Sequence, residues 1–351
     1  MPRLLCLLLA ACFAVPAFAQ YEESITVSRI IFDVRVTKSN GQAIADLKPE
    51  DFTVEVGGAP ARVVSASWIE EGAVAPAPPK VRVERSEDGE RVLRATAGAE
   101  EPRLIVVFIQ TDFARNAVRL GGQMKFRSYA EELVRSFAPA DRLAVFSFDS
   151  HLKFRSDLTA DKDAVVAAMR DAIRIDLPPP PPTVAEPSLA PHLDREAMKR
   201  ATSSEEGLLL VSNALKTIPG AKTLLLLGWG LGDLANGQIV MKPEWKDAWR
   251  ALEEARVTMI SLDTTDASHD LAAGLSSAAV QTGGFYSAAA QSPRIAVQRV
   301  QGTMRGRYEL ELIASKPLDA GTHGIAVRVN RKKAEVLAPA AITISVSEST
   351  S

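Results

Sequence analysis

Side chains that could bind a ligand occur in three short segments, each near the end of a predicted strand or the start of a predicted helix. They are Gln110, Asp112, Phe113, Thr159, Trp229 and Gly230. Carboxylate, hydroxyl and amide oxygens are ligands of hard cations such as Mg²⁺. An indole cannot ligate a metal but suits a protein-binding surface. These residue types therefore point to ion binding or protein recognition rather than to bond cleavage.

Patterns typical of enzymes are missing from the sequence. The four histidines lie far apart, and none has metal-ligand spacing such as His-Glu-x-x-His. There is no Gly-x-Ser-x-Gly elbow and no phosphate-binding loop. Asp263, Asp266 and Asp270 follow a predicted strand, where we expect a loop of solvated carboxylates. We predict that the protein is not an enzyme. A hydrolase assembled from scattered residues is the alternative, because catalytic groups need to meet only in space.

Length and charge narrow the class of protein. A chain of 351 residues suits about two domains. Its apolar content of 46% and its charged content of 24% are ordinary for a globular protein. The formal net charge of −2 gives no basic field. We therefore predict no nucleic-acid partner.

The first residues have the pattern of a secretory signal peptide, which we assign to residues 1–19. Arg3 supplies the positive start, and residues 4–15 form an apolar stretch too short to span a bilayer. Residues 17–19 read Ala-Phe-Ala, a small-x-small cleavage site, so the mature chain is expected to begin at Gln20. The sequence thus predicts an exported protein, periplasmic or extracellular.

Both cysteines, Cys6 and Cys12, lie inside the predicted signal. The mature protein would therefore have no disulfide, no thiolate nucleophile and no cysteine-ligated metal. Leu9-Ala-Ala-Cys12 also resembles a bacterial lipobox, so a lipid anchor at Cys12 is the alternative to cleavage after Ala19. No later segment is apolar over a length that could span a membrane.

The hydrophobic period changes twice along the chain. Residues 20–70 alternate apolar and polar positions, as half-buried strands do, and residues 304–348 return to that period. Residues 71–102 have the composition of a linker with a small hairpin. Residues 103–303 alternate strand and helix, which predicts a parallel sheet with helices on both faces. We predict a doubly wound, Rossmann-like α/β domain inserted in a β-sandwich that the N- and C-terminal segments form together.

Within residues 103–303, four segments carry a family resemblance: residues 138–148, 157–159, 219–227 and 282–284. In order and spacing they resemble the von Willebrand factor A domain. With residues 38–41 and 47–53, the whole mature chain resembles exported bacterial proteins described as von Willebrand A-related. For the first helices we expect one over about residues 122–137 and a second that begins near Thr159.

The resemblance implies a divalent-cation site, but the residues at that place differ from the family pattern. The family uses an Asp-x-Ser-x-Ser loop, a Thr from a second loop and an Asp from a third. Here Gln110, Asp112 and Ala114 occupy the first loop, Thr159 matches the Thr, and Trp229 replaces the last Asp. With one carboxylate, one hydroxyl and one amide, we predict neither a metal nor a cofactor. Thr159 could equally cap the second helix.

These observations predict a non-enzymatic module that binds a protein partner through the loops at the carboxyl edge of its sheet, where α/β folds present ligands. Aromatic side chains such as Trp229 and Phe113 would contact the partner. The alternative is a structural envelope protein whose A domain is a relic scaffold.

Overall fold

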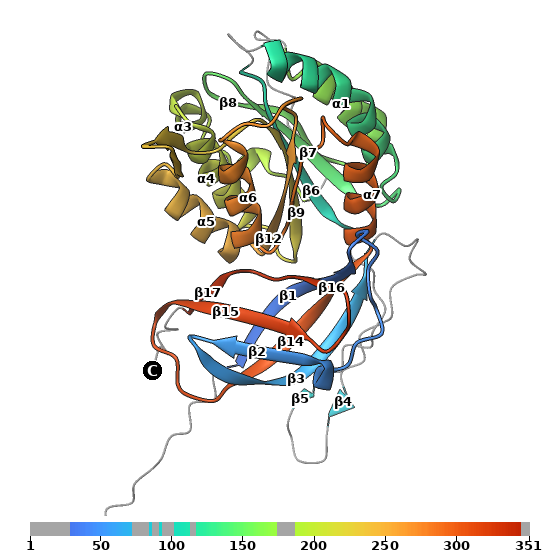
Figure 1. Cartoon of the computed structure of the whole chain (residues 1–351), viewed down its shortest axis with the longest axis vertical. Helices are drawn as coiled ribbons and strands as arrows, with labels where there is room; N and C mark the ends of the chain where they lie inside the picture. The colour runs from blue at the N-terminus through green and yellow to red at the C-terminus, as the bar shows by residue number, and fades with distance from the viewer. Residues whose placement is uncertain are drawn as a thin grey trace, which may run out of the picture.

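The computed structural model describes residues 29–71, 84–85, 91–92, 102–112, 117–173 and 187–344. The predicted signal peptide with Cys12, the residue Phe113 and most of the Pro-rich stretch near residue 180 lie outside the described residues. Two bodies are stacked on one another, a layered α/β body and a body of strands (Figure 1). None of the described helices is long and apolar enough to cross a membrane.

The α/β body is built on a six-stranded sheet with the order β13-β12-β9-β6-β7-β8. Its strands are β6 (Leu104–Gln110), β7 (Arg142–Phe148), β8 (Leu152–Thr159), β9 (Lys222–Gly228), β12 (Val257–Asp263) and β13 (Tyr286–Ser287). Neighbouring strands are parallel except β8, which runs antiparallel to β7 at one edge. The central strands are near-continuous apolar runs because helices bury both of their faces. The predicted α/β class is confirmed, with an antiparallel edge strand that the sequence did not reveal.

Helices cover both faces of this sheet (Figure 1). One side carries α1 (Ala117–Arg135), α2 (Lys162–Asp171) and α7 (Pro293–Thr303). The other carries α3 (Arg195–Arg200), α4 (Ser204–Leu215), α5 (Glu244–Glu254) and α6 (Ala272–Gln281). Successive side chains of β6 alternate between the two cores: Ile105 and Val107 face the first set of helices, and Val106 and Phe108 face the second.

The first two helices begin at places other than those predicted. α1 starts at Ala117, before residue 122. α2 starts at Lys162, and its N-cap is Asp161, whose carboxylate accepts hydrogen bonds from the backbone N–H groups of Asp163 and Ala164. Thr159 is therefore not the helix cap. It ends β8, and its hydroxyl accepts a hydrogen bond from the Asp161 N–H at 3.1 Å.

Strands from both ends of the chain form one antiparallel sheet with the order β16-β1-β14-β3-β2-β15-β17. They are β1 (Arg29–Lys38), β2 (Phe52–Val56), β3 (Ala59–Glu70), β14 (Gly306–Ala314), β15 (Gly321–Val329), β16 (Ala334–Leu337) and β17 (Ala341–Ile344). Tyr308 of β14 is fully buried in their shared core, between the rings of Phe52 and Trp68. Its hydroxyl accepts a hydrogen bond from the Leu47 N–H. Short strands β4 (Glu84–Arg85) and β5 (Arg91–Val92) form a separate antiparallel pair.

Ion pairs join the two bodies at the amino ends of the parallel strands. Arg256, directly before β12, contacts Asp33 and Glu309 at 2.9 Å each. From the other body, the buried Arg35 donates a hydrogen bond to Thr258 Oγ1 at 3.0 Å. Asp33 and Arg35 are the least exposed groups in these contacts, and Arg256 is partly exposed. The strand body therefore holds one edge of the sheet, and the carboxyl edge lies on the far side.

Candidate functional site

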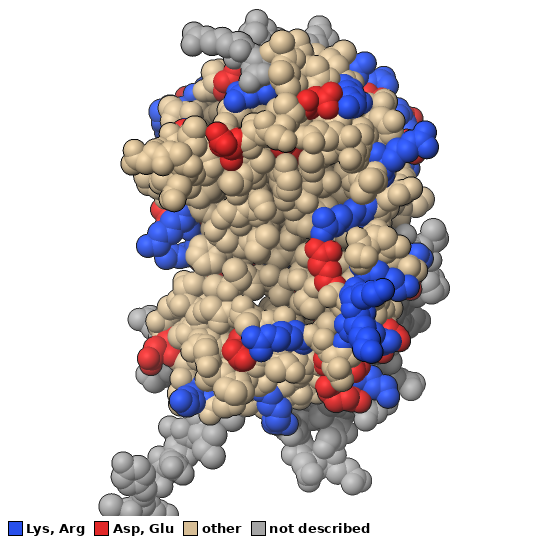
Figure 2. All heavy atoms as spheres, in the orientation of Figure 1, with Lys and Arg blue, Asp and Glu red and all other residues tan. Residues whose placement is uncertain are grey.

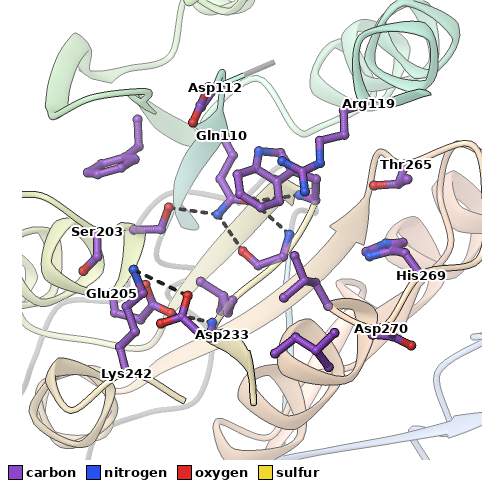
Figure 3. A pocket seen from close by; sticks show the side chains of 18 of the residues that line it. Gln110, Asp112, Arg119, Ser203, Glu205, Asp233, Lys242, Thr265, His269 and Asp270 are labelled. Carbon is purple, nitrogen blue, oxygen red and sulfur yellow. Dashed lines mark hydrogen bonds and ion pairs between the residues drawn. The ribbon is translucent and has the colours of Figure 1, made fainter. Parts of the chain in front are cut away.

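Gln110, the last residue of β6, links three loops at the carboxyl edge (Figure 3). Its side chain is buried, with the residue 2% exposed. The amide oxygen accepts hydrogen bonds from the N–H groups of Trp229, at 2.7 Å, and Gly230, at 3.2 Å. The amide nitrogen donates to Ser204 Oγ, at 2.8 Å, and to the Gly230 carbonyl, at 2.7 Å. These four bonds use the full hydrogen-bonding capacity of the amide.

Gly228 and Gly230 have a steric role in this link. A Cβ added at Gly228 would lie 2.4 Å from the Gln110 amide oxygen. A Cβ at Gly230 would lie 2.7 Å from the Leu271 Cβ. The absence of a side chain at Gly228, which ends β9, lets the following loop approach Gln110 closely enough to bond its amide, and Gly230 leaves room for Leu271.

A cavity of about 500 Å³ opens at this edge. Of the predicted binding residues, Gln110, Asp112, Trp229 and Gly230 line it together. Phe113 lies outside the described residues. On the face shown in Figure 2, acidic and basic side chains are interspersed over both bodies, as the small net charge suggests.

Thr159 does not belong to this site. Because β8 is antiparallel, Thr159 lies opposite Leu143, near the start of β7, whereas Gln110 lies opposite Phe148 at its end. Five residues of strand separate those two positions, about 16 Å at 3.3 Å per residue. The prediction that Thr159 joins the other loops is wrong, because it assumed that every strand ends at the same edge.

The residue that does contact Gln110 is Ser204, the first residue of α4, and the sequence did not lead us to predict this contact. Ser203 is the N-cap of α4, and its hydroxyl accepts a hydrogen bond from the Glu206 N–H at 3.1 Å. The pattern Ser-x-x-Glu at Ser203 and Glu206 is the sequence signal of such a helix start. It could have placed Ser204 at the carboxyl edge, since helices on a parallel sheet run back antiparallel to the strands and so begin where strands end.

Trp229 is half-buried beneath Arg119, a residue in the first turn of α1. The guanidinium carbon lies 3.5 Å from the centre of the indole ring, a cation–π contact. Burial lowers the pKa of Arg119, and the negative charge of Asp112 opposes that shift. The indole Nε1 is buried and has no hydrogen-bond partner among the described residues. Trp229 thus has one ring face occupied by a cation from the same chain.

A second polar cluster lies beside the cavity and corrects the prediction of a solvated carboxylate loop. Asp263, the last residue of β12, is 0% exposed. Its carboxylate accepts hydrogen bonds from the Tyr286 hydroxyl at 2.7 Å, from the Thr265 N–H at 2.8 Å and from His269 Nε2 at 2.8 Å. Burial, the hydrogen bond to Asp263 and its charge all raise the pKa of the Tyr286 hydroxyl. Asp266 and Asp270, by contrast, are exposed as predicted.

The residues at the carboxyl edge do not fit a divalent cation. The Gln110 amide is saturated by protein groups, and the Trp229 side chain offers no oxygen. Among the described residues, no group of three or more His, Cys, Asp or Glu side chains is arranged to hold a metal ion. Magnesium requires near-octahedral oxygen ligation. The arrangement is instead that of a preformed polar pocket.

No family model matches the sequence, and no curated protein matches it. Among solved structures, the chain is similar to a von Willebrand factor type A protein from Catenulispora acidiphila, at 11% identity and a TM-score of 0.41, over 88% of this chain and 75% of that one. It is also similar to the D319A mutant of the PilB minor pilin from Streptococcus sanguinis, at 8% identity and a TM-score of 0.38, over 80% and 79% of the two chains.

A third similarity is to proximal thread matrix protein 1 from the mussel byssus, at 14% identity and a TM-score of 0.39. It covers 58% of this chain and 48% of that protein, so the chain spans about half of its length. Similarities this distant carry no argument about function, which has to come from the site itself.

Proposed function

We propose that this protein is an exported, non-enzymatic interaction module of von Willebrand A type that binds a protein partner through its carboxyl-edge loops without a metal. The observation that carries the proposal is the Gln110 amide, which bonds the loops at residues 204 and 229–230 directly. Loops held by a neutral side chain keep their arrangement without an ion. The pocket is therefore formed before the partner arrives, which reduces the entropy cost of binding.

The position of the site suits a partner of macromolecular size. The strand body contacts the amino ends of the sheet, through Arg256 and its neighbours, and leaves the carboxyl edge uncovered (Figure 1). We propose that residues 20–70 and 304–348 are the support that presents residues 103–303, with residues 71–102 as the linker, and that residues 1–19 direct export. A lipid anchor at Cys12 is the alternative to cleavage after Ala19.

The cluster of Asp263 and His269 is the feature that would favour a hydrolase. An imidazole oriented by a buried carboxylate is one half of a nucleophile-activating pair. Such a pair needs a hydroxyl or thiol bonded to the second ring nitrogen. Among the described residues, no such group is hydrogen-bonded to His269 Nδ1. The observed contacts therefore favour recognition over catalysis.

The proposal is tested by a pull-down from envelope extract with the mature chain and its Trp229→Ala variant. Trp249→Ala is the matched control, because Trp249 is also half-buried but lies on α5, outside the cavity. We expect Trp229→Ala to lose partners that the wild type and the control retain, with circular dichroism showing that both variants fold. An unchanged partner set for Trp229→Ala would overturn the proposal and support the purely structural alternative.

A further inference from the structure

We propose that the carboxyl-edge cavity receives the ammonium group of a lysine side chain from the partner. This inference rests on the proposed function and specifies the chemistry of its site. The cavity wall formed by the loop after β12 supplies the acceptors, and the excess of carboxylates around the cavity supplies the charge.

The charge of the lining favours a cation. The lining contains five carboxylates and two cations, and Lys153, next to the lining, pairs with one of the carboxylates, Asp149, so negative groups exceed positive ones by two. The carboxylates are Asp112, Asp149, Glu205, Asp233 and Asp270, and the cations are Arg119 and Lys242. Glu205 is buried, and its carboxylate accepts a hydrogen bond from the Gly232 N–H. It is therefore a poorer contact for a ligand than the exposed carboxylates. A partly enclosed cavity with an excess of negative charge concentrates cations.

Three residues with hydrogen-bond acceptors, Thr265, His269 and Asp270, line one side of the cavity (Figure 3). Thr265 is 5% exposed, lines the cavity, and its hydroxyl has no hydrogen-bond partner among the described residues. Asp270 also lines the cavity, and its side chain is exposed. An unpaired buried hydroxyl costs free energy, which a ligand that bonds it would recover. Thr265 is the observation, independent of the acidic residues, that points to a bound group here.

His269 completes this wall. Its Nε2 faces the Asp263 carboxylate at 2.8 Å, and that carboxylate also accepts bonds from the Tyr286 hydroxyl and the Thr265 N–H. A carboxylate acceptor fixes the proton of the neutral ring on Nε2, so Nδ1 is left as an acceptor. Thr265, His269 and Asp270 thus offer one acceptor group each. A lysine ammonium has three donors and matches them in number.

Arg119 shows that the cavity already accommodates a cation (Figure 3). Its guanidinium covers the Trp229 ring at 3.5 Å. This contact fills the aromatic position, so the added cation is expected on the wall of Thr265, His269 and Asp270. A carboxylate ligand would meet the excess negative charge of the lining instead. Like charges brought together in a partly enclosed site disfavour binding.

The test is a titration of the mature chain, labelled with ¹⁵N in its histidines, with N-acetyl-lysine methylamide. The probes for comparison are the norleucine and glutamate analogues and butylamine. We expect the lysine analogue to bind at millimolar concentration and to shift the His269 Nδ1 resonance, while the other three histidine signals stay fixed. Asp270→Asn and Thr265→Val should weaken binding roughly tenfold, the scale of one lost hydrogen bond to a charged group.

Asp266→Asn is the matched control, because Asp266 lies in the same loop but is paired with Lys125 and does not line the cavity. It should bind the lysine analogue as the wild type does. Equal weakening in Asp266→Asn would mean that only the general negative field acts, and it would overturn the inference. If the glutamate analogue bound more strongly than the lysine analogue, the cavity would prefer an anion, and the inference would be overturned.

The titration with the lysine analogue and the pull-down with Trp229→Ala can fail independently of each other. If Trp229→Ala loses partners but the lysine analogue does not bind, the edge is an interaction site and the lysine assignment is wrong. If the lysine analogue binds but Trp229→Ala keeps every partner, the proposed function fails while the ammonium site stands. Tighter binding of butylamine than of the lysine analogue would identify a small amine and overturn the assignment to a partner side chain.

Discussion

Replacing Gln110 with leucine tests directly whether its amide holds the carboxyl-edge loops together. Gln110→Leu keeps the side chain similar in size but removes all four of its hydrogen bonds. The N–H groups of Trp229 and Gly230 would then be left without their acceptor. An unpaired buried group costs about 1–3 kcal/mol. The two N–H groups together should therefore lower the free energy of unfolding by about 3 kcal/mol.

Thermal unfolding followed by circular dichroism measures this loss. At roughly 2–4 °C per kcal/mol for a domain of the size of the α/β body, we expect Tm to fall by about 6–12 °C. Gln301→Leu is the matched control, because Gln301 makes one exposed hydrogen bond, to Ser136 Oγ. Its Tm should change by no more than about 2 °C, as for most surface substitutions. Equal Tm values for the two variants would refute the idea that the amide holds the loops.

Three further predictions concern the same edge. Excess Mg²⁺ or Mn²⁺ should raise Tm by less than about 1 °C over a chelator, because stabilisation by a ligand requires a Kd below its concentration; a rise of several degrees that Asp112→Ala abolishes would show a working metal site. Gly228→Ala should lower the free energy of unfolding by about 1–3 kcal/mol through its clash with Gln110, and urea unfolding should find a smaller loss in a Gln110→Ala background; equal losses in both backgrounds would contradict this contact. Burial raises the pKa of Asp149, but the hydrogen bond from Lys153 and bonds from Ser150 outweigh it and hold the pKa at about 2. Since this folded-state pKa is below the ordinary 3.8, the pair of Asp149 and Lys153 stabilises the fold above pH 3.8, and this stabilisation is lost as the pH falls towards 2. Acid unfolding of Lys153→Met should therefore begin at a higher pH than that of the wild type. Coincident unfolding curves would argue against a stabilising pair.

The order of elements could be predicted because each burial pattern follows from neighbours in the chain. Residues 104–109 are apolar without interruption, as a strand covered on both faces must be. Tyr308, Leu310 and Leu312 alternate with polar residues, as a strand with one buried face does. The strand β8 was the exception. Its antiparallel direction depends on the turn that joins it to β7, and residues 152–159 have no hydrophobic period that would show it.

The candidate site was predicted only in part, because the direction of one strand could not be read from the sequence. Gln110 and Trp229 were correctly brought together, because Gln110 ends β6 and Trp229 follows β9, and these neighbouring parallel strands end at one edge of the sheet. Thr159 was misplaced, since the direction of its strand was unknown. Asp263 was mistaken for a solvated residue because the residues that follow it, up to Asp266, are polar, whereas its carboxylate is hydrogen-bonded to His269 and Tyr286.

The sequence alone determined the alternation of strands and helices and the replacement of the family's cation ligands, because hydrophobic period and residue type are local properties. Only the tertiary structure decided what the replacements do. Gln110 meets Ser204 across 94 positions of the chain and Gly230 across 120. Which donors an amide bonds, and which carboxylate is buried, depend on side chains that approach only after the sheet has assembled. Hydrogen bonding and burial are properties of distance in space, and spacing in sequence does not encode them.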